Sequence, residues 1–530
     1  MNELAPILIE GEWRPADDVA GRFHAVDPST GEAIAGDFPN SGAKDVERAV
    51  AAASAVAAEL AATEPSTIAD FLERYADGIE AAAAELVELA HAETGLPREP
   101  RLAKVELPRT TGQLRQAATA VRGYRWTQPV IDTRAGLRSH LAPLGKPVLV
   151  FGPNNFPFAF NGIAGSDFAS AIAARNPVIA KAHPSHPHTC RKLAEIAHAA
   201  LKASGLPAAA VQMLYRFDSR IGTHMAGDDR VGAIGFTGSR NAGLALKAAA
   251  DKVGVLAFVE LSSVNPVYLL SGALTERGEA LAGEFFTSCT MGSGQFCTNP
   301  GIVVVPKDAA GDAFVAAAQT KFAAGVSGVL FSQGVRDGLV ESVATLRKAG
   351  AECLAGGGIG EEPGFRFQPT LLSVDAKTFL ADPASLQTEA FGPVSLLVRT
   401  DDVAQMVAVA GAFEGNLTAT IYTAGDDRDD AVWTEVAPVL RRRVGRLIAN
   451  RMPTGVAVSP AQNHGGPFPS TGHPGFTAVG MPAAIHRFAA LHSYDNVADR
   501  HLPVELRDRN PGGVPRLVDG AWTDADVSGA

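Results

Sequence analysis

The chain has 530 residues, of which 46% are hydrophobic and 19% are charged, and its formal net charge at pH 7 is −11. This length predicts two or three domains with separate cores, and the composition excludes a disordered protein. Acidic residues outnumber basic residues by 57 to 46, which argues against a nucleic-acid partner bound by a basic face.

The N-terminal segment 1–13 contains three glutamates and lacks the basic and apolar regions of a secretory signal, so a cytoplasmic protein is expected. The Ala-rich segment 50–62 is interrupted by Glu59 and has no apolar run of about 18 residues, so no membrane partner is expected.

The four cysteines are too few and too scattered for a disulfide framework, and none has the close pairing of a zinc site: Cys190, Cys289, Cys297 and Cys353. The pattern is still compatible with a single cysteine that has a reactive thiol.

Apolar residues recur at helical spacing over 43–93, which predicts amphipathic helices that end at the Thr-Gly-Leu-Pro sequence 94–97. Short apolar runs follow and alternate with Ala-rich helical stretches at 164–174 and 189–203. The runs are Val148–Phe151, 178–180 and Val211–Leu214. This alternation predicts a parallel α/β sheet with crossover helices.

A second set of apolar runs predicts a second α/β domain: 257–261, 267–270, 301–305, 394–398 and 417–422. The segment 126–147 and the tail after Leu491 fit neither alternation. Two interpretations are open for each segment: an exposed loop, or an arm that pairs with another subunit.

Cys297 follows a Gly-Ser-Gly turn, where the backbone can approach a ligand closely. A thiol in that position is a candidate nucleophile, although a lone cysteine is more commonly a buried structural residue.

Glu260 lies inside the apolar run 258–261, where burial would raise the carboxyl pKa toward the range of a general base. The alternative is a glutamate that faces solvent at the end of a strand.

Three further segments follow apolar runs and carry ligand-type groups. Asn155 lies in a turn after a strand, where its amide could donate to an oxyanion, although an ordinary Asn-rich turn is the plainer interpretation. Lys181 ends a strand, and the segment 235–239, which contains Gly238 and Ser239, begins a helix after another strand. These positions suit a ribose and a phosphate, whereas a surface lysine and a helix-capping serine are the alternatives.

Taken together and in this order, these segments resemble the aldehyde dehydrogenase superfamily over nearly the whole chain. The matching motifs are Asn-Phe-Pro at 155–157, the strand end at Lys181, Phe-Thr-Gly-Ser at 236–239, Glu-Leu at 260–261, Gly-Gln-x-Cys at 294–297 and Glu-x-Phe-Gly-Pro-Val at 389–394. The chain departs from the family pattern at Ser262 and Ser263, usually two glycines, and at Asn154, usually an aromatic residue. Segments 260–266, 453–456, 464–469 and 502–508 look like the 2-oxoglutarate semialdehyde (2,5-dioxopentanoate) dehydrogenases.

The resemblance implies an α/β aldehyde dehydrogenase fold in three parts. A Rossmann-like cofactor domain would comprise 1–125 and 148–259, and an α/β catalytic domain would comprise 260–480. A small β oligomerisation flap and tail would comprise 126–147 and 481–530 and would assemble a homodimer or homotetramer.

The implied activity is the NAD(P)-dependent oxidation of a small-molecule aldehyde to a carboxylate through a cysteine thioester, with 2,5-dioxopentanoate as the expected substrate. A medium-chain or long-chain fatty aldehyde dehydrogenase is the alternative within the family. A thiol esterase is the alternative outside it, but such an enzyme would need a histidine beside the thiol, and the sequence offers no obvious partner.

The resemblance also implies the site residues. Cys297 would attack the aldehyde, Asn155 and the Cys297 backbone N–H would hold the oxyanion, and Glu260 would activate water. NADP or NAD would be bound by Lys181, Arg216, Gly238, Ser239, Glu389 and Phe391. Phe160, Phe296, His464 and Phe468 would line the substrate tunnel, and no metal is expected. Because Pro184 stands where NAD-selective relatives often carry a carboxylate, NADP should be accepted at least as well as NAD.

Overall fold

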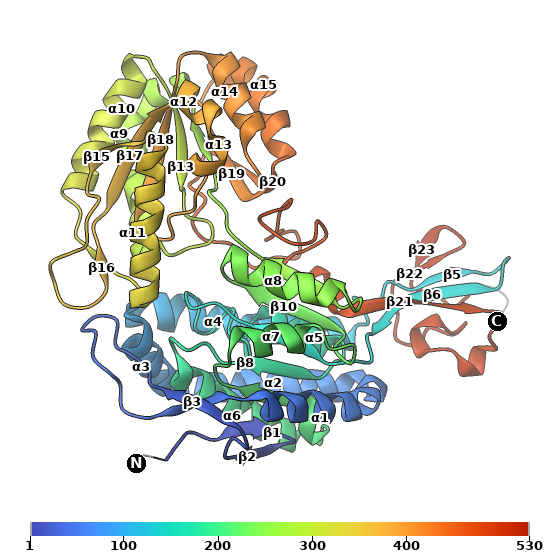
Figure 1. Ribbon diagram of the computed structural model, residues 1–530. Coiled ribbons are helices and arrows are strands. Elements are labelled where there is room, and N and C mark those ends of the chain that lie inside the picture. Colours follow the sequence, from blue (N-terminus) through green and yellow to red (C-terminus); the bar gives the residue numbers. More distant parts are fainter. Residues whose placement is uncertain (1–2, 528–530) are drawn as a thin grey trace.

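The computed structural model describes residues 3–527, which form two α/β lobes and a small projecting sheet (Figure 1). The first lobe contains a seven-stranded sheet in the order β11-β10-β7-β8-β9-β1-β2. Its strands are β1 (Ile7–Ile9), β2 (Glu12–Arg14), β7 (Val148–Phe151), β8 (Val178–Lys181), β9 (Val211–Leu214), β10 (Ala233–Thr237) and β11 (Leu256–Glu260). The five strands from β7 to β11 are parallel. The prediction of a parallel sheet with crossover helices is therefore confirmed.

Helices cover this sheet because their apolar stripes need a partner surface. The helical region predicted over 43–93 consists of α1 (Ala43–Ala62), α2 (Pro65–Ala81) and α3 (Ala83–Thr94), and α3 ends at Gly95 in the left-handed conformation. The remaining helices of the lobe are a π-helical segment (Arg98–Glu106), α4 (Leu107–Arg122), α5 (Ser166–Ala173), α6 (Pro187–Ala203), α7 (Ser219–Ala226) and α8 (Arg240–Asp251). A hairpin of β3 (Val19–Phe23) and β4 (Phe38–Ser41) completes it.

The second lobe holds another seven-stranded sheet, in the order β15-β17-β18-β13-β12-β19-β20. The strands are β12 (Val267–Leu269), β13 (Ile302–Pro306), β15 (Glu352–Ala355), β17 (Thr370–Asp375), β18 (Val394–Thr400), β19 (Asn416–Tyr422) and β20 (Val444–Ala449). The helices are α9 (Ser271–Thr290), α10 (Ala309–Ala323), α11 (Gln333–Lys348), α12 (Ala376–Ala381), α13 (Pro383–Leu386), α14 (Val403–Ala412) and α15 (Asp430–Arg441). The predicted second α/β unit is confirmed.

Two details of the strand prediction were wrong. The run 257–261 belongs to the first sheet, because β11 pairs in parallel with β10 from Leu256 opposite Ala233 to Glu260 opposite Thr237. In addition, 235–237 lie in β10, and the helix begins only at Arg240. An apolar run carries no information about which sheet it joins, and α8 supplies the crossover that returns β11 to the first sheet.

The two segments that fit neither alternation pair with each other. They form a five-stranded sheet, β21-β6-β5-β22-β23, which projects from the first lobe (Figure 1). Its strands are β5 (Val130–Asp132), β6 (Leu137–Pro143), β21 (Ala489–Asp495), β22 (Arg516–Val518) and β23 (Ala521–Thr523). Within residues 3–527, no helix combines the length and apolarity needed to cross a membrane.

Candidate active site

Cys297 is presented by a strained turn at the end of α9. Gly292, Ser293 and Gly294 all have positive φ, at 55°, 56° and 70°. Gly294 also packs against the backbone of Gly392, so a Cβ at position 294 would lie only 2.1 Å from the Gly392 carbonyl oxygen. Only glycine fits there, and this close approach fixes the backbone that leads into Cys297.

Glu260 and His464 reach the thiol from two further elements. Glu260 is the last residue of β11, and the segment after His464 folds back along the free edge of this strand. The Leu261 N–H donates to the Ser470 carbonyl at 2.8 Å, and the Gly472 N–H donates to the Val259 carbonyl at 2.9 Å. This pairing carries the 464–469 turn over the end of the first sheet.

The three side chains meet in one buried cluster. Nε2 of His464 lies 3.4 Å from Sγ of Cys297 and 3.1 Å from Oε1 of Glu260. The side chains of His464 and Glu260 are only 1% and 2% exposed. One ligand-type atom of each residue lies within 4.8 Å of the other two. The cluster is therefore a contiguous thiol, imidazole and carboxylate.

The sequence offers no obvious histidine partner for the thiol, but the structure places one beside it. His464 was assigned to the tunnel wall, but its imidazole contacts Sγ directly. The two residues are 167 positions apart in the chain, so their contact depends on the pairing of 470–472 with β11, which no local pattern reveals.

The surroundings of Cys297 favour the protonated thiol. Burial raises the pKa of Cys297 well above its ordinary value, and the nearby carboxylates of Glu260 and Glu389 raise it further, whereas the Arg109 guanidinium lowers it. A thiolate therefore requires a base within reach, and the imidazole of His464 is the group in contact with Sγ.

Asn155 lies next to the segment that precedes the thiol. Its Nδ2 donates to the Gln295 carbonyl at 2.9 Å, and the residue is 5% exposed. A side-chain amide has two N–H groups, so this bond leaves one for another acceptor. The backbone N–H of Cys297 has no acceptor within residues 3–527. Two donors thus remain available near the sulfur.

Aromatic rings form the wall beside the cluster, and the guanidiniums of Arg101 and Arg109 stack on them. Phe156 makes edge contacts with Phe160 and Phe296, at centroid distances of 5.1 and 5.6 Å. The ring of Phe160 lies 6.0 Å from that of His464. Phe160, Phe296 and His464 therefore gather as expected, whereas Phe468 does not. This residue is 65% exposed.

Four of the six expected cofactor residues lie at the carboxyl ends of strands of the first sheet, where parallel α/β sheets bind ligands. Lys181 ends β8, and burial lowers its pKa to about 8. Arg216 follows β9 and is exposed. Gly238 and Ser239 precede α8, whose N-cap makes no side-chain hydrogen bond, so the first backbone N–H groups of this helix are free for a phosphate. These donors fit a dinucleotide.

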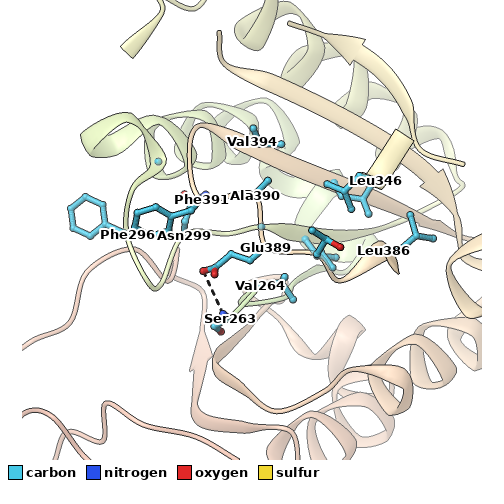
Figure 2. A pocket seen from close by; sticks show the side chains of 15 residues that line it. Ser263, Val264, Phe296, Asn299, Leu346, Leu386, Glu389, Ala390, Phe391 and Val394 are labelled. Carbon is cyan, nitrogen blue, oxygen red and sulfur yellow. Dashed lines mark hydrogen bonds between the residues drawn. The ribbon is translucent and has the colours of Figure 1, made fainter. Parts of the chain in front are cut away.

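Glu389 lies in a pocket that Ser263, Val264 and Leu386 also line (Figure 2). Burial raises its pKa to about 7, and the Ser263 N–H donates to its Oε1 at 3.4 Å. Phe391 and Phe296 line the same pocket. Ser263, a departure from the family pattern, is used internally, since its hydroxyl lies 3.0 Å from Oδ1 of Asn416.

The remaining cysteines lie apart from this cluster. Cys289 is buried, and burial raises its pKa to about 12. Cys190 is buried against His186, at 3.3 Å from Nδ1, and Cys353 lies in β15 and is partly exposed. Cys297 alone of the four contacts a histidine that is paired with a carboxylate.

Comparison with known proteins gives a consistent result. The pattern of the aldehyde dehydrogenase family matches residues 13–489. The alpha-ketoglutaric semialdehyde dehydrogenase 2 of Azospirillum brasilense is 41% identical, with 94% of this chain and 96% of that protein covered. The alpha-ketoglutaric semialdehyde dehydrogenase of Acinetobacter baylyi is 37% identical, with 92% and 93% covered.

Solved structures agree with the fold. Lactaldehyde dehydrogenase from Escherichia coli superimposes with a TM-score of 0.80 at 24% identity, covering 93% of this chain and 98% of that one. A Pseudomonas syringae aldehyde dehydrogenase in complex with NAD+ and octanal gives a TM-score of 0.77 at 22% identity, covering 94% and 98%.

Proposed function

This chain belongs to the aldehyde dehydrogenase family, and we propose that it oxidises 2,5-dioxopentanoate to 2-oxoglutarate through a thioester on Cys297. Alpha-ketoglutaric semialdehyde is another name for this dioxo acid. The two relatives named for it are 41% and 37% identical over more than nine-tenths of the chain, which supports the substrate assignment. NAD(P) is the oxidant, as in the family.

The observation that carries the chemistry is the contact between the thiol, the imidazole and the carboxylate. His464 takes the proton of the Cys297 thiol, and Glu260 stabilises the imidazolium at 3.1 Å. The sulfur then attacks the aldehyde carbon. The resulting oxyanion accepts from the second N–H of Asn155 and from the backbone N–H of Cys297, and one such donor is typically worth about 3 kcal/mol.

Collapse of the thiohemiacetal gives the thioester and releases a hydride, for which NAD(P), when bound, would supply the acceptor. Residues from both lobes would hold this cofactor. Glu389 would accept from ribose hydroxyls, and Phe391 would pack nearby. Lys181 and the free N–H groups at the start of α8 would hold the adenosine half.

Hydrolysis of the thioester requires a base that is not already occupied. Oε1 of Glu260 faces His464, whereas Oε2 is buried and has no partner in the described part of the chain. This free oxygen takes a proton from water, and the hydroxide adds to the thioester carbon. The C–S bond of the tetrahedral intermediate then breaks, and the sulfur recovers a proton from the imidazolium of His464. Glu260 and the product acid release their protons to solvent, so the product leaves as a carboxylate.

We further propose that NADP is accepted at least as well as NAD. Position 184 is proline, so no carboxylate there repels a 2′-phosphate. Lys181 and Arg216 lie close enough for their charges to interact, which supports a cationic site for that phosphate, with Arg216 as its partner. The substitution Pro184→Glu should shift the preference toward NAD.

A thiol esterase is the second candidate, since His464 supplies the histidine that such an enzyme needs. It would release product from a thioester or ester without cofactor. The dehydrogenase would instead form one reduced cofactor for each aldehyde consumed, so measuring reduced cofactor and carboxylate together distinguishes the two.

The three-part division and the assembly are also proposals. The first lobe would bind the cofactor, the second would supply Cys297, and the projecting sheet would join subunits into a homodimer or homotetramer. In this sheet Leu491 on β21 and Trp522 on β23 are each 69% exposed. Large apolar side chains on outer strands are typical of surfaces that pair with another subunit.

A further inference from the structure

Arg109, in the first turn of α4, is a cation without a carboxylate partner. Nε and Nη2 of its guanidinium are buried and have no hydrogen-bond acceptor in the described part of the chain, and no carboxylate oxygen there lies within 4 Å. Its single hydrogen bond runs from Nη1 to the Val456 carbonyl, at 3.0 Å. Burial lowers the pKa of Arg109 to about 10, so the group is still charged at neutral pH. An unpaired buried guanidinium is costly, which makes it a candidate binding group.

The guanidinium lies beside the thiol cluster. Its carbon is 5.0 Å from the centroid of the Phe160 ring, and that ring is 6.0 Å from the imidazole that contacts Cys297. On the other side, Val456 follows Gly455, whose N–H donates to the side chain of Thr298, the residue after Cys297. The charges of Cys297 and Glu260 both act on Arg109.

Arg101, which shares the same aromatic wall, is paired with a carboxylate, and only its Nε is buried without an acceptor. It forms an ion pair with the buried carboxylate of Glu106, and its Nη2 donates to the Asn155 carbonyl at 3.0 Å. Both arginines stack against Phe156, at 4.6 Å for Arg101 and 5.8 Å for Arg109. Arg109 therefore differs in two respects: it has no carboxylate partner in the described part of the chain, and both Nε and Nη2, which form one edge of its guanidinium, lack an acceptor.

We propose that Arg109 binds the carboxylate of an acidic aldehyde substrate and so selects such aldehydes over uncharged ones. The inference rests on the proposed function and names the cation that the reaction requires. A guanidinium presents two N–H groups in the geometry of a carboxylate, and the pair is strong where water is excluded. In 2,5-dioxopentanoate the carboxylate carbon lies roughly 5 Å from the aldehyde carbon, because four C–C bonds of about 1.5 Å separate them.

Arg446 is the competing cation near the sulfur. It lines an open cavity of about 560 Å³ together with Arg451 and Met291. Its Nη2, however, already donates to two carbonyls, those of Pro453 and Gly455, each at 3.2 Å. Arg446 therefore has one nitrogen committed to the 453–455 loop and a buried Nε without an acceptor. In Arg109 both Nε and Nη2 lack an acceptor, so a whole edge of that guanidinium is open to a carboxylate.

The test compares wild type, Arg109→Leu, Arg109→Lys and the matched variant Arg446→Gln. For each, kcat and KM are measured with 2,5-dioxopentanoate and with hexanal, and inhibition is measured with glutarate, an unreactive dicarboxylate. Melting temperature and NAD affinity establish that each variant is folded. In Arg109→Leu, kcat/KM for the dioxo acid should fall by about 30-fold or more, mainly through KM, while the value for hexanal should change less than about threefold.

Glutarate inhibition should weaken in parallel, and Arg109→Lys should recover part of the loss because it retains the charge but not the planar fork. Arg446→Gln should keep the acid-to-hexanal ratio within about threefold of wild type. An equal fall for both substrates, or a selective loss in Arg446→Gln instead, would overturn the assignment of Arg109. A wild type that prefers hexanal overturns the proposed function itself, whereas an acid preference that survives in Arg109→Leu overturns only this inference.

Discussion

Glu260 directs Oε1 toward Nε2 of His464, at 3.1 Å, and leaves its buried Oε2 without a partner in the described part of the chain. One carboxylate can therefore serve both halves of the reaction. Through Oε1 it stabilises the imidazolium that forms when the thiol loses its proton, and through Oε2 it can activate water. This division leads to different expectations for the two residues.

The substitution His464→Asn should slow the first turnover by about 10²-fold to 10⁴-fold near neutral pH, since the thiol would lose its contacting base. Rapid mixing with excess aldehyde measures the rate of the reduced-cofactor burst. Burial raises the pKa of Cys297, so the residual burst rate should rise roughly tenfold per pH unit as thiolate becomes more abundant. Cys289→Ala is the control and should keep the wild-type burst. An unchanged burst in His464→Asn would show that the imidazole does not act on the thiol.

The substitution Glu260→Gln should give a slowed burst of about one reduced cofactor per site and then stall. The burst is slowed because the imidazolium loses its counter-charge, and turnover stops because the thioester lacks a base for water. Mass spectrometry of the stalled enzyme should find the acyl group on the peptide that contains Cys297. Continued steady-state turnover at the wild-type rate would contradict this role.

Much of the fold follows from the sequence, because short apolar runs bounded by Gly, Pro or Asn mark strands such as β7 and β9 at their observed limits. The Gly-Ser-Gly turn before Cys297 and the apolar run that contains Glu260 can also be recognised from neighbouring residues in the sequence. The contact of His464 with Cys297 is not, since it depends on a backbone pairing between distant segments. The unpaired state of Arg109 could not be predicted either, because it depends on Glu106 binding Arg101 instead.

Cofactor affinity should depend on pH through two groups. Glu389, with its pKa raised to about 7, accepts hydrogen bonds from hydroxyls only when ionised, so affinity should increase as pH rises through about 7. Lys181, with its pKa lowered to about 8, loses its charge as pH rises further, so affinity should decrease above about 8. Titration with NAD, which itself does not ionise in this range, measures both limbs. Glu389→Gln should remove the acid limb and Lys181→Met the alkaline limb; a flat wild-type profile would contradict the assignment.

Zinc should inhibit the enzyme reversibly by binding the thiol cluster. The distances of 3.4 Å from Sγ to Nε2 and 3.1 Å from Nε2 to Oε1 are close to the edges of about 3.3 to 3.6 Å in a tetrahedral zinc site. Micromolar Zn²⁺ should stop turnover, a chelator should restore it, and His464→Asn should be much less sensitive in its residual activity. Equal sensitivity of wild type and variant would place the inhibitory site elsewhere.

The central claim is that this aldehyde dehydrogenase acts on an acidic semialdehyde, and the comparison of kcat/KM for 2,5-dioxopentanoate, succinate semialdehyde and hexanal tests it most directly. The dioxo acid should give the highest value, followed by succinate semialdehyde and then hexanal. A hexanal value tenfold above that of the dioxo acid, about 1.4 kcal/mol of transition-state preference, would contradict the claim and favour a fatty aldehyde dehydrogenase.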